Sequence, residues 1–163
     1  MLINLARRAA VLALVAVAAA PVAHAQTANQ TVTFAVNAIN QIAFVGTPSL
    51  TITTAVAGSA PTSVTDATSS WAVTTNQTGA KITASIPTIM PTGLTLSANL
   101  ATPAGGTSAG YLALGTTAVD LVTGITKLAQ ASLAVTYKLD ATVAAGVVTS
   151  ATRVVTYTIT GGV

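Results

Sequence analysis

Threonine and valine alternate along much of this chain, and this pattern restricts the folds that it can adopt. In Thr31–Val36 the apolar side chains of Val32, Phe34 and Val36 lie on one face of an extended segment. Alternation with a period of two residues is typical of a strand that is buried on one face only. The same pattern predicts further strands at 41–45, 50–56, 70–75, 81–86, 93–100, 131–139 and 152–160, and two shorter ones at 111–114 and 118–122.

Turn-forming residues separate these segments at short intervals. Gly46–Pro48 and Gly58–Pro61 end two of the predicted strands, and residues 102–110 form a loop of small residues. No helical period is found after residue 25. Many short strands with turns every 8–12 residues or so predict an all-β fold, an antiparallel immunoglobulin-like β-sandwich of about 8–10 short strands.

Two pairs of these strands are predicted to be neighbours. Segments 70–75 and 81–86 form a predicted hairpin around Asn76–Gly79, where glycine tolerates the positive φ of a tight turn. The final pair, 131–139 and 152–160, flanks a turn near Gly146.

Residues 1–25 have the three parts of a secretory signal peptide. Arg7 and Arg8 give a positive start, residues 9–20 are apolar, and Ala23 to Ala25 form a small-x-small cleavage site. The apolar run is shorter than the roughly 20 residues that span a membrane, so we expect cleavage after Ala25 and not a retained anchor. The arginine pair lacks the flanking residues of a twin-arginine signal, which favours Sec-type export. A single domain, residues 26–163, is then secreted, periplasmic or at the cell surface.

Removal of the signal peptide leaves very few charged groups. Residues 26–163 contain four basic residues and three Asp, a net charge of +1, and no His, Cys or Glu. Nucleic-acid binding needs basic residues clustered on one face, so we expect no nucleic-acid partner. No segment approaches about 18 uninterrupted apolar residues, and we expect no transmembrane span in the mature chain. Without cysteine, the domain depends on burial and strand pairing for its stability.

This inventory also argues against catalysis. The usual general base, the thiol nucleophile and the imidazole metal ligand are all missing after residue 25. Asp66, Asp120 and Asp140 are far apart in the sequence, and each lies beside turn-type residues. We therefore expect no enzyme activity, no cofactor and no metal. A calcium site is the least improbable exception, with Asp66 as its best candidate ligand.

Two aromatic residues are candidates for ligand contact. Trp71 is the only tryptophan, and Tyr111 follows the glycine-rich loop at 102–110. Aromatic rings stack on sugars, but a single Trp at a strand start is also a common core residue. Both interpretations stay open for Trp71.

The alternating segment Thr31–Val36, the turn at Gly146 and the closing strand Val154–Thr160 together resemble secreted bacterial β-sandwich proteins of the pilin-like and spore-coat-U-like kind. In pilins that a chaperone and an usher assemble, each subunit lacks one strand of its sandwich, and the N-terminal segment of the next subunit supplies it. The resemblance implies that Val32, Phe34 and Val36 fill the groove of a neighbour. It also implies a periplasmic chaperone as a partner. Many of these relatives have a disulfide near the first strand, and this chain has no cysteine.

The sequence thus favours a secreted or cell-surface structural protein that acts in surface assembly or adhesion and assembles by strand addition. Two alternatives remain. Thr31–Val36 is either a donated strand or the first strand of the chain's own fold. In the second alternative, the protein is a monomeric extracellular module that binds carbohydrate or another surface ligand through Trp71, Tyr111 and the 101–110 loop.

Overall fold

The computed structural model describes residues 24–162, so the predicted signal peptide lies outside it except for its last two residues. The chain divides after Ala35 into two units, and the domain proper begins at Val36. No strand is found in residues 24–39. The elements of the domain are β1 (Asn40–Val45), β2 (Val64–Thr75), β3 (Ala80–Ser85), β4 (Leu94–Leu100), β5 (Thr107–Ser108), β6 (Leu112–Ala113), β7 (Val119–Ile125), β8 (Leu128–Ala141), the 3-10 helix η1 (Val143–Ala145) and β9 (Thr156–Thr160).

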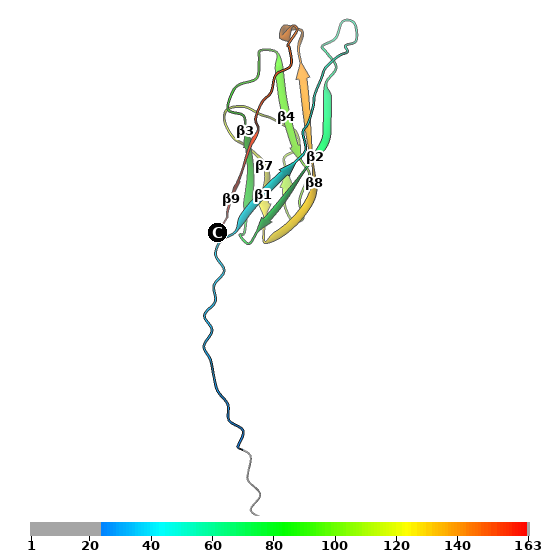
Figure 1. The fold of residues 1–163 in the computed structure, drawn as a ribbon. Helices are drawn as coiled ribbons and strands as arrows, with labels where there is room; N and C mark the ends of the chain where they lie inside the picture. The colour runs from blue at the N-terminus through cyan, green and yellow to red at the C-terminus, as the bar shows by residue number, and fades with distance from the viewer. Residues whose placement is uncertain (1–23, 163) are drawn as a thin grey trace, which may run out of the picture. The chain divides into compact units, whose positions relative to one another are not determined.

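The nine strands form two sheets, which Figure 1 shows as two layers. The five-stranded sheet has the order β1-β2-β8-β4-β6, and the four-stranded sheet has the order β5-β7-β3-β9. Every strand pair is antiparallel. The predicted all-β sandwich is therefore confirmed. In the part of the chain that the structure describes, no helix is long and apolar enough to cross a membrane.

The core lies between the two sheets and contains the inward residues that the alternation indicates. Trp71 and Val73 of β2 and Val135 of β8 come from one sheet, Ile82 of β3 and Leu121 of β7 come from the other, and all five side chains are buried. Successive strand residues point to opposite faces, so the polar residues between them face outward.

Both predicted strand pairs are wrong in their partners. β2 pairs with β1 and β8, whereas β3 pairs with β7 and β9, so the turn at Asn76–Gly79 carries the chain from one sheet to the other. β8 and β9 likewise belong to different sheets. Gly79 does have the positive φ, 73°, that the turn was predicted to need. Alternation indicates which face of a strand is buried, but not which strand lies beside it.

Two predicted strands are partly or wholly unpaired. Residues 50–56 form no strand, and their one ladder contact is an isolated bridge between Ala55 and Pro61. The last strand begins at Thr156 and not at Thr152. Both departures lie on the same side of the sandwich, where residues of the two segments line one cavity.

Candidate assembly site

The C-terminal strand leaves one edge of its sheet open. β9 pairs with β3 along one side, and no strand in residues 24–162 pairs with its other side. In immunoglobulin sandwiches of the constant type, strands A, B, E and D form one sheet and C, F and G the other. Here β1-β2-β8-β4 follows the first order and β3-β9 follows C and F. The place of strand G, beside F, is the open edge of β9.

The opening continues along the chain before β9. Residues 147–155 descend from η1 toward β9 (Figure 1), and no backbone hydrogen bond joins them to any other described backbone group. Residues 147–152 are exposed, and alternate burial is found only at the end of the segment, where Arg153 and Val155 are half-buried. The segment has no partner strand.

A second unpaired segment faces the first. After Gly46, residues 47–53 run without a backbone hydrogen bond to the rest of the described chain, although Leu50 and Ile52 turn half-buried side chains inward. Gly46 has a φ of 121°, and a Cβ placed there would lie 2.8 Å from the Cα of Ser69. Only glycine fits where the chain passes this close to β2. After this point, residues 47–53 are no longer paired with the sheet.

A cavity of about 720 Å³ lies between these two segments. Met90, Leu94 and Leu139 contribute apolar side chains to its lining, and threonine and serine from residues 48–55 and 148–153 line its walls. We call this space, with the two unpaired segments, the groove. The two unpaired segments make no backbone–backbone hydrogen bond, although the Ser49 N–H and the Thr152 carbonyl are bonded to side chains. An incoming strand requires such unpaired backbone groups beside side-chain pockets.

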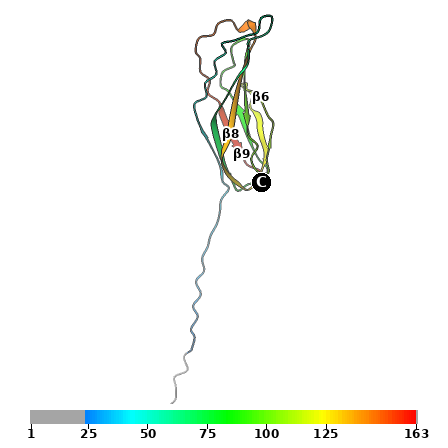
Figure 2. The same ribbon diagram turned by 90° about the vertical axis from the view of Figure 1, so that its right-hand side faces the viewer.

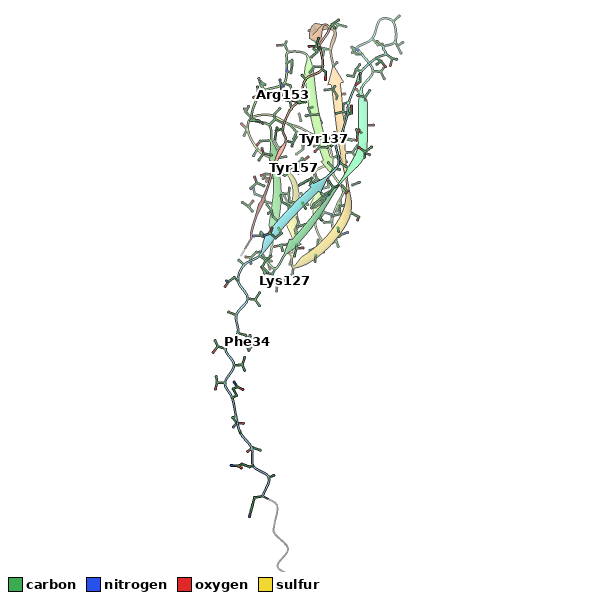
Figure 3. The ribbon with its side chains drawn as sticks, in the orientation of Figure 1. Phe34, Lys127, Tyr137, Arg153 and Tyr157 are labelled. Carbon is green, nitrogen blue, oxygen red and sulfur yellow. The ribbon has the colours of Figure 1, made fainter. Side chains whose placement is uncertain are left out.

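Arg153 is the only charged residue that lines the groove. Its Nη1 donates to the Thr152 carbonyl at 2.9 Å and its Nη2 to the Ile89 carbonyl at 3.3 Å, while its buried Nε has no partner among the described residues. Figure 3 shows it on the segment that leads to β9. A buried donor without a partner costs stability, so a carbonyl oxygen of an added strand would be stabilising here.

Aromatic residues link the two sheets after the unpaired segment 147–155. Phe44 of β1 and Tyr157 of β9 stack across the two sheets with centroids 3.8 Å apart. Tyr157 shares a 2.8 Å hydrogen bond between hydroxyls with Tyr137 of β8. Burial raises the pKa of both tyrosines, so they stay neutral. None of the three residues lines the cavity.

The three predicted assembly residues are exposed. Val32, Phe34 and Val36 have exposed fractions of 72%, 89% and 80%. The segment that contains them is not a strand of the structure, whose first strand is β1. Figure 3 labels Phe34. Three large apolar side chains in alternation are costly to leave in water, which makes this segment a candidate for pairing with another chain.

One side chain holds the residues just before β1. Asn76 accepts a hydrogen bond from the Ile39 N–H and donates one from Nδ2 to the Asn37 carbonyl, both at 2.8 Å. Its backbone N–H also donates to the Ile39 carbonyl, at 3.2 Å. These bonds extend the β1–β2 ladder, so residues 37–39 continue in line with β1. We call this set of contacts the Asn76 clamp; nothing in the sequence pattern indicated it.

The two candidate ligand residues have different environments. Trp71 is 1% exposed and forms part of the core, 6.4 Å from Phe44 by ring centroids. Its ring is not accessible to a ligand in this structure. Tyr111 is exposed just before β6. The two rings are therefore not presented as one binding face.

The three Asp residues are not brought together, and the described residues contain no cluster of metal-ligating side chains. Asp120 pairs with Lys81 at 3.0 Å, and Asp140 pairs with Lys138 at 2.9 Å and bonds the Ser63 hydroxyl. The oxygens of Asp66 are occupied by the Thr68 hydroxyl, the Ser49 N–H and the Thr68 N–H, which lower its pKa in that order. Asp66 thus ties the start of the groove wall to β2.

Comparisons with protein-family models, with curated proteins and with solved structures each found no match for this chain.

Proposed function

We propose that this protein is a structural subunit of a secreted or cell-surface assembly, in which each copy receives the N-terminal segment of another copy as an added strand. The observation that carries the proposal is the groove, where two segments without strand partners face each other across a cavity that Met90, Leu94 and Leu139 line in part. The segment 26–37 of a second copy is the proposed donor, because it has matching alternation and is exposed. Donated strands of this kind combine main-chain hydrogen bonds with side-chain pockets.

The dimensions of the two parts agree. The unpaired residues 147–155 beside the cavity number nine, and the alternating part of the donor segment, 31–36, has six. In the donor the apolar side chains of Val32, Phe34 and Val36 face one way, while Thr31, Thr33 and Ala35 face the other. One face would fill the cavity and the other would remain in solvent, as in every other strand of the sandwich.

An open groove is a hazard before assembly, since unpaired edges and apolar pockets promote aggregation. A periplasmic chaperone that covers the groove during export is therefore a second proposed partner. Catalysis is not part of the proposal, because the mature chain lacks His, Cys and Glu. A monomeric carbohydrate-binding module is the less supported candidate, since of its two aromatic residues Tyr111 alone is exposed.

The test uses the protein purified after export of the full chain, analysed by size exclusion and by gels in SDS with and without boiling. We expect multimers that survive cold SDS and dissociate on heating. Phe34→Asp should weaken assembly by more than about tenfold, because it removes about 2 kcal/mol or more of apolar burial. Thr33→Asp, on the opposite face of the same segment, is the matched control and should leave the multimers intact. A monomer whose behaviour is unchanged by deletion of Gln26–Asn37 would contradict the proposal.

A further inference from the structure

The direction of β9 determines where a donated strand leaves the groove. β9 runs toward the end of the domain that holds the Asn76 clamp, as the chain end marked in Figures 1 and 2 shows. We call this end, with Ile39, Asn76 and Lys127, the exit end. At the opposite end, the loop end, lie η1 and the loop at 56–60 (Figure 2). All strand pairs of the domain are antiparallel. A strand that continues this pattern runs from the exit end to the loop end.

The donor domain must then lie close to the loop end of the acceptor. Val36 is the last alternating apolar residue of the segment, and β1 of the donor begins at Asn40. The residues between them, 37–39, span only about 10 Å when extended. In the donor they are held by its own Asn76 clamp. The exit end of the donor is thereby brought against the loop end of the acceptor.

The surfaces at the two ends are suited to contact each other. At the loop end, Val56, Val143 and Val147 are 69%, 80% and 100% exposed, and their loops, 56–60 and 143–148, contain no charged residue. At the exit end there is a shallow hollow of about 420 Å³, in which Ile39, Leu128 and Ala129 are apolar and Thr74, Thr75, Asn76 and Lys127 are polar. An uncharged group of protruding valines is a typical interaction surface.

We propose that the valine loops of one subunit, 56–60 and 143–148, pack into the exit-end hollow of the next subunit. This contact is a second interface in addition to the donated strand, and it rests on the proposed strand addition. The partner is a second copy of this chain, because the short connection at residues 37–39 places the hollow of that copy beside the valines. The apolar loops are thus covered in the assembly and exposed only in the free subunit.

The chain has no cysteine, so engineered pairs report the contact directly. The double variant Val147→Cys with Ala129→Cys should form intermolecular disulfides after mild oxidation of the multimers. Val45→Cys with Ala129→Cys is the matched control, because Val45 is also well exposed but lies on the outer face of β1. Since assembly raises the local concentration of a facing pair, we expect at least about tenfold more cross-linking for the first pair. Deletion of Gln26–Asn37 should abolish the difference.

The outcomes separate this inference from the proposed function. Multimers that depend on residues 26–37, but in which the Val147–Ala129 pair cross-links no more than the control, would overturn the loop contact alone. Cross-linking of the single variant Ala129→Cys to itself would overturn it too, because two exit ends would then meet, as in parallel addition. Absence of multimers in the unmodified protein would contradict strand addition itself.

A second measurement does not depend on disulfide geometry. Val143→Asp places a charge in the proposed contact at a fully surface position, so the subunit should fold normally. Multimer dissociation on dilution should occur at roughly tenfold higher concentration, as expected for loss of one buried valine. Val45→Asp should leave the dissociation unchanged, and an equal effect of the two variants would argue against the interface.

Discussion

The half of the sandwich near the exit end and the half near the loop end differ in strand pairing, although both contain strand-like sequence. Near the exit end, β2, β3, β7 and β8 are paired on both sides, and side chains such as Ile82 are fully buried. Near the loop end, Leu50 and Ile52 alternate with Thr51 and Thr53, yet neither residues 47–53 nor residues 147–155 have a strand partner. The difference shows that a strand sequence needs a neighbour to become a strand, and that the open half lacks one.

The largest expected effect is a contrast in core stability between the halves. Ile82→Ala, in the closed half, should lower the free energy of unfolding by about 2–4 kcal/mol, because it leaves a cavity in a fully packed site. Ile52→Ala, in the groove wall, should cost less than about 1.5 kcal/mol in the free subunit, because its side chain is only half-buried. Urea unfolding of a subunit without residues 26–37 measures both.

If Ile82→Ala does not fold, Ile82→Val can replace it in the comparison, with an expected loss of about 1 kcal/mol in the free energy of unfolding. Equal costs at the two positions would mean that the halves do not differ in packing. In assembled protein the cost of Ile52→Ala should rise, because the donated strand completes its burial.

A free peptide with the sequence of residues 26–37 should bind in the groove and supply the strand partner that residues 47–53 and 147–155 lack. A peptide with residues 26–37 should stabilise the domain lacking that segment by about 2.7 kcal/mol at a hundred times its dissociation constant. Amide hydrogen exchange should slow at residues 47–53 and 147–155, which have no backbone partners in the free domain. The Phe34→Asp peptide is the control and should give neither effect. Stabilisation without protection of these two segments would place the peptide elsewhere.

The closed half was largely predictable from the sequence, and the open half was not. Alternation identified β1, β2, β3, β4 and β8, because each of these strands buries one face in a two-sheet core. The same signal at 50–56 and 152–155 led to strands that the isolated chain does not form. Strand partners depend on the path between the sheets, so the hairpin predicted for 70–75 and 81–86 was also wrong. Thr31–Val36 was predicted as a candidate donor, but the Asn76 clamp and Arg153 act through backbone groups that no residue pattern reveals.

Loss of the Asn76 clamp should allow the N-terminal segment to enter the groove of its own subunit and not that of a neighbour. Asn76→Ala removes two hydrogen bonds to residues 37 and 39, and should lower the free energy of unfolding by about 1–2 kcal/mol. It should also let residues 37–39 turn back, so that more subunits fill their own groove and remain monomeric. Size exclusion of refolded protein measures the monomer fraction. Gln41→Ala, exposed on β1, should change neither quantity, and an unchanged monomer fraction in Asn76→Ala would show that the clamp does not direct assembly.

The smallest expected effect concerns pH and the attachment of the groove wall. Hydrogen bonds from the Thr68 hydroxyl, the Ser49 N–H and the Thr68 N–H hold the pKa of Asp66 below its ordinary value. A carboxyl group whose pKa is lower in the folded state contributes stability above its unfolded pKa, and loses it as the pH falls through the folded value. The effect should be below about 1 kcal/mol, because the group is partly exposed and screened by solvent.

Urea midpoints measured from about pH 6 down to pH 2 should therefore fall less steeply in Asp66→Asn than in the unmodified protein. The protection factor of the Ser49 N–H, its exchange rate compared with the intrinsic rate at the same pH, should fall over this pH range, because that N–H loses its charged acceptor. Ile82, in the closed half, should keep its protection factor. Asp120→Asn, which removes a solvent-exposed ion pair with Lys81, is the matched control and should leave exchange at Ser49 unchanged. Loss of protection at Ser49 and Ile82 together would mean that acid unfolds the two halves as one unit, and the distinction between them would hold for packing but not for stability.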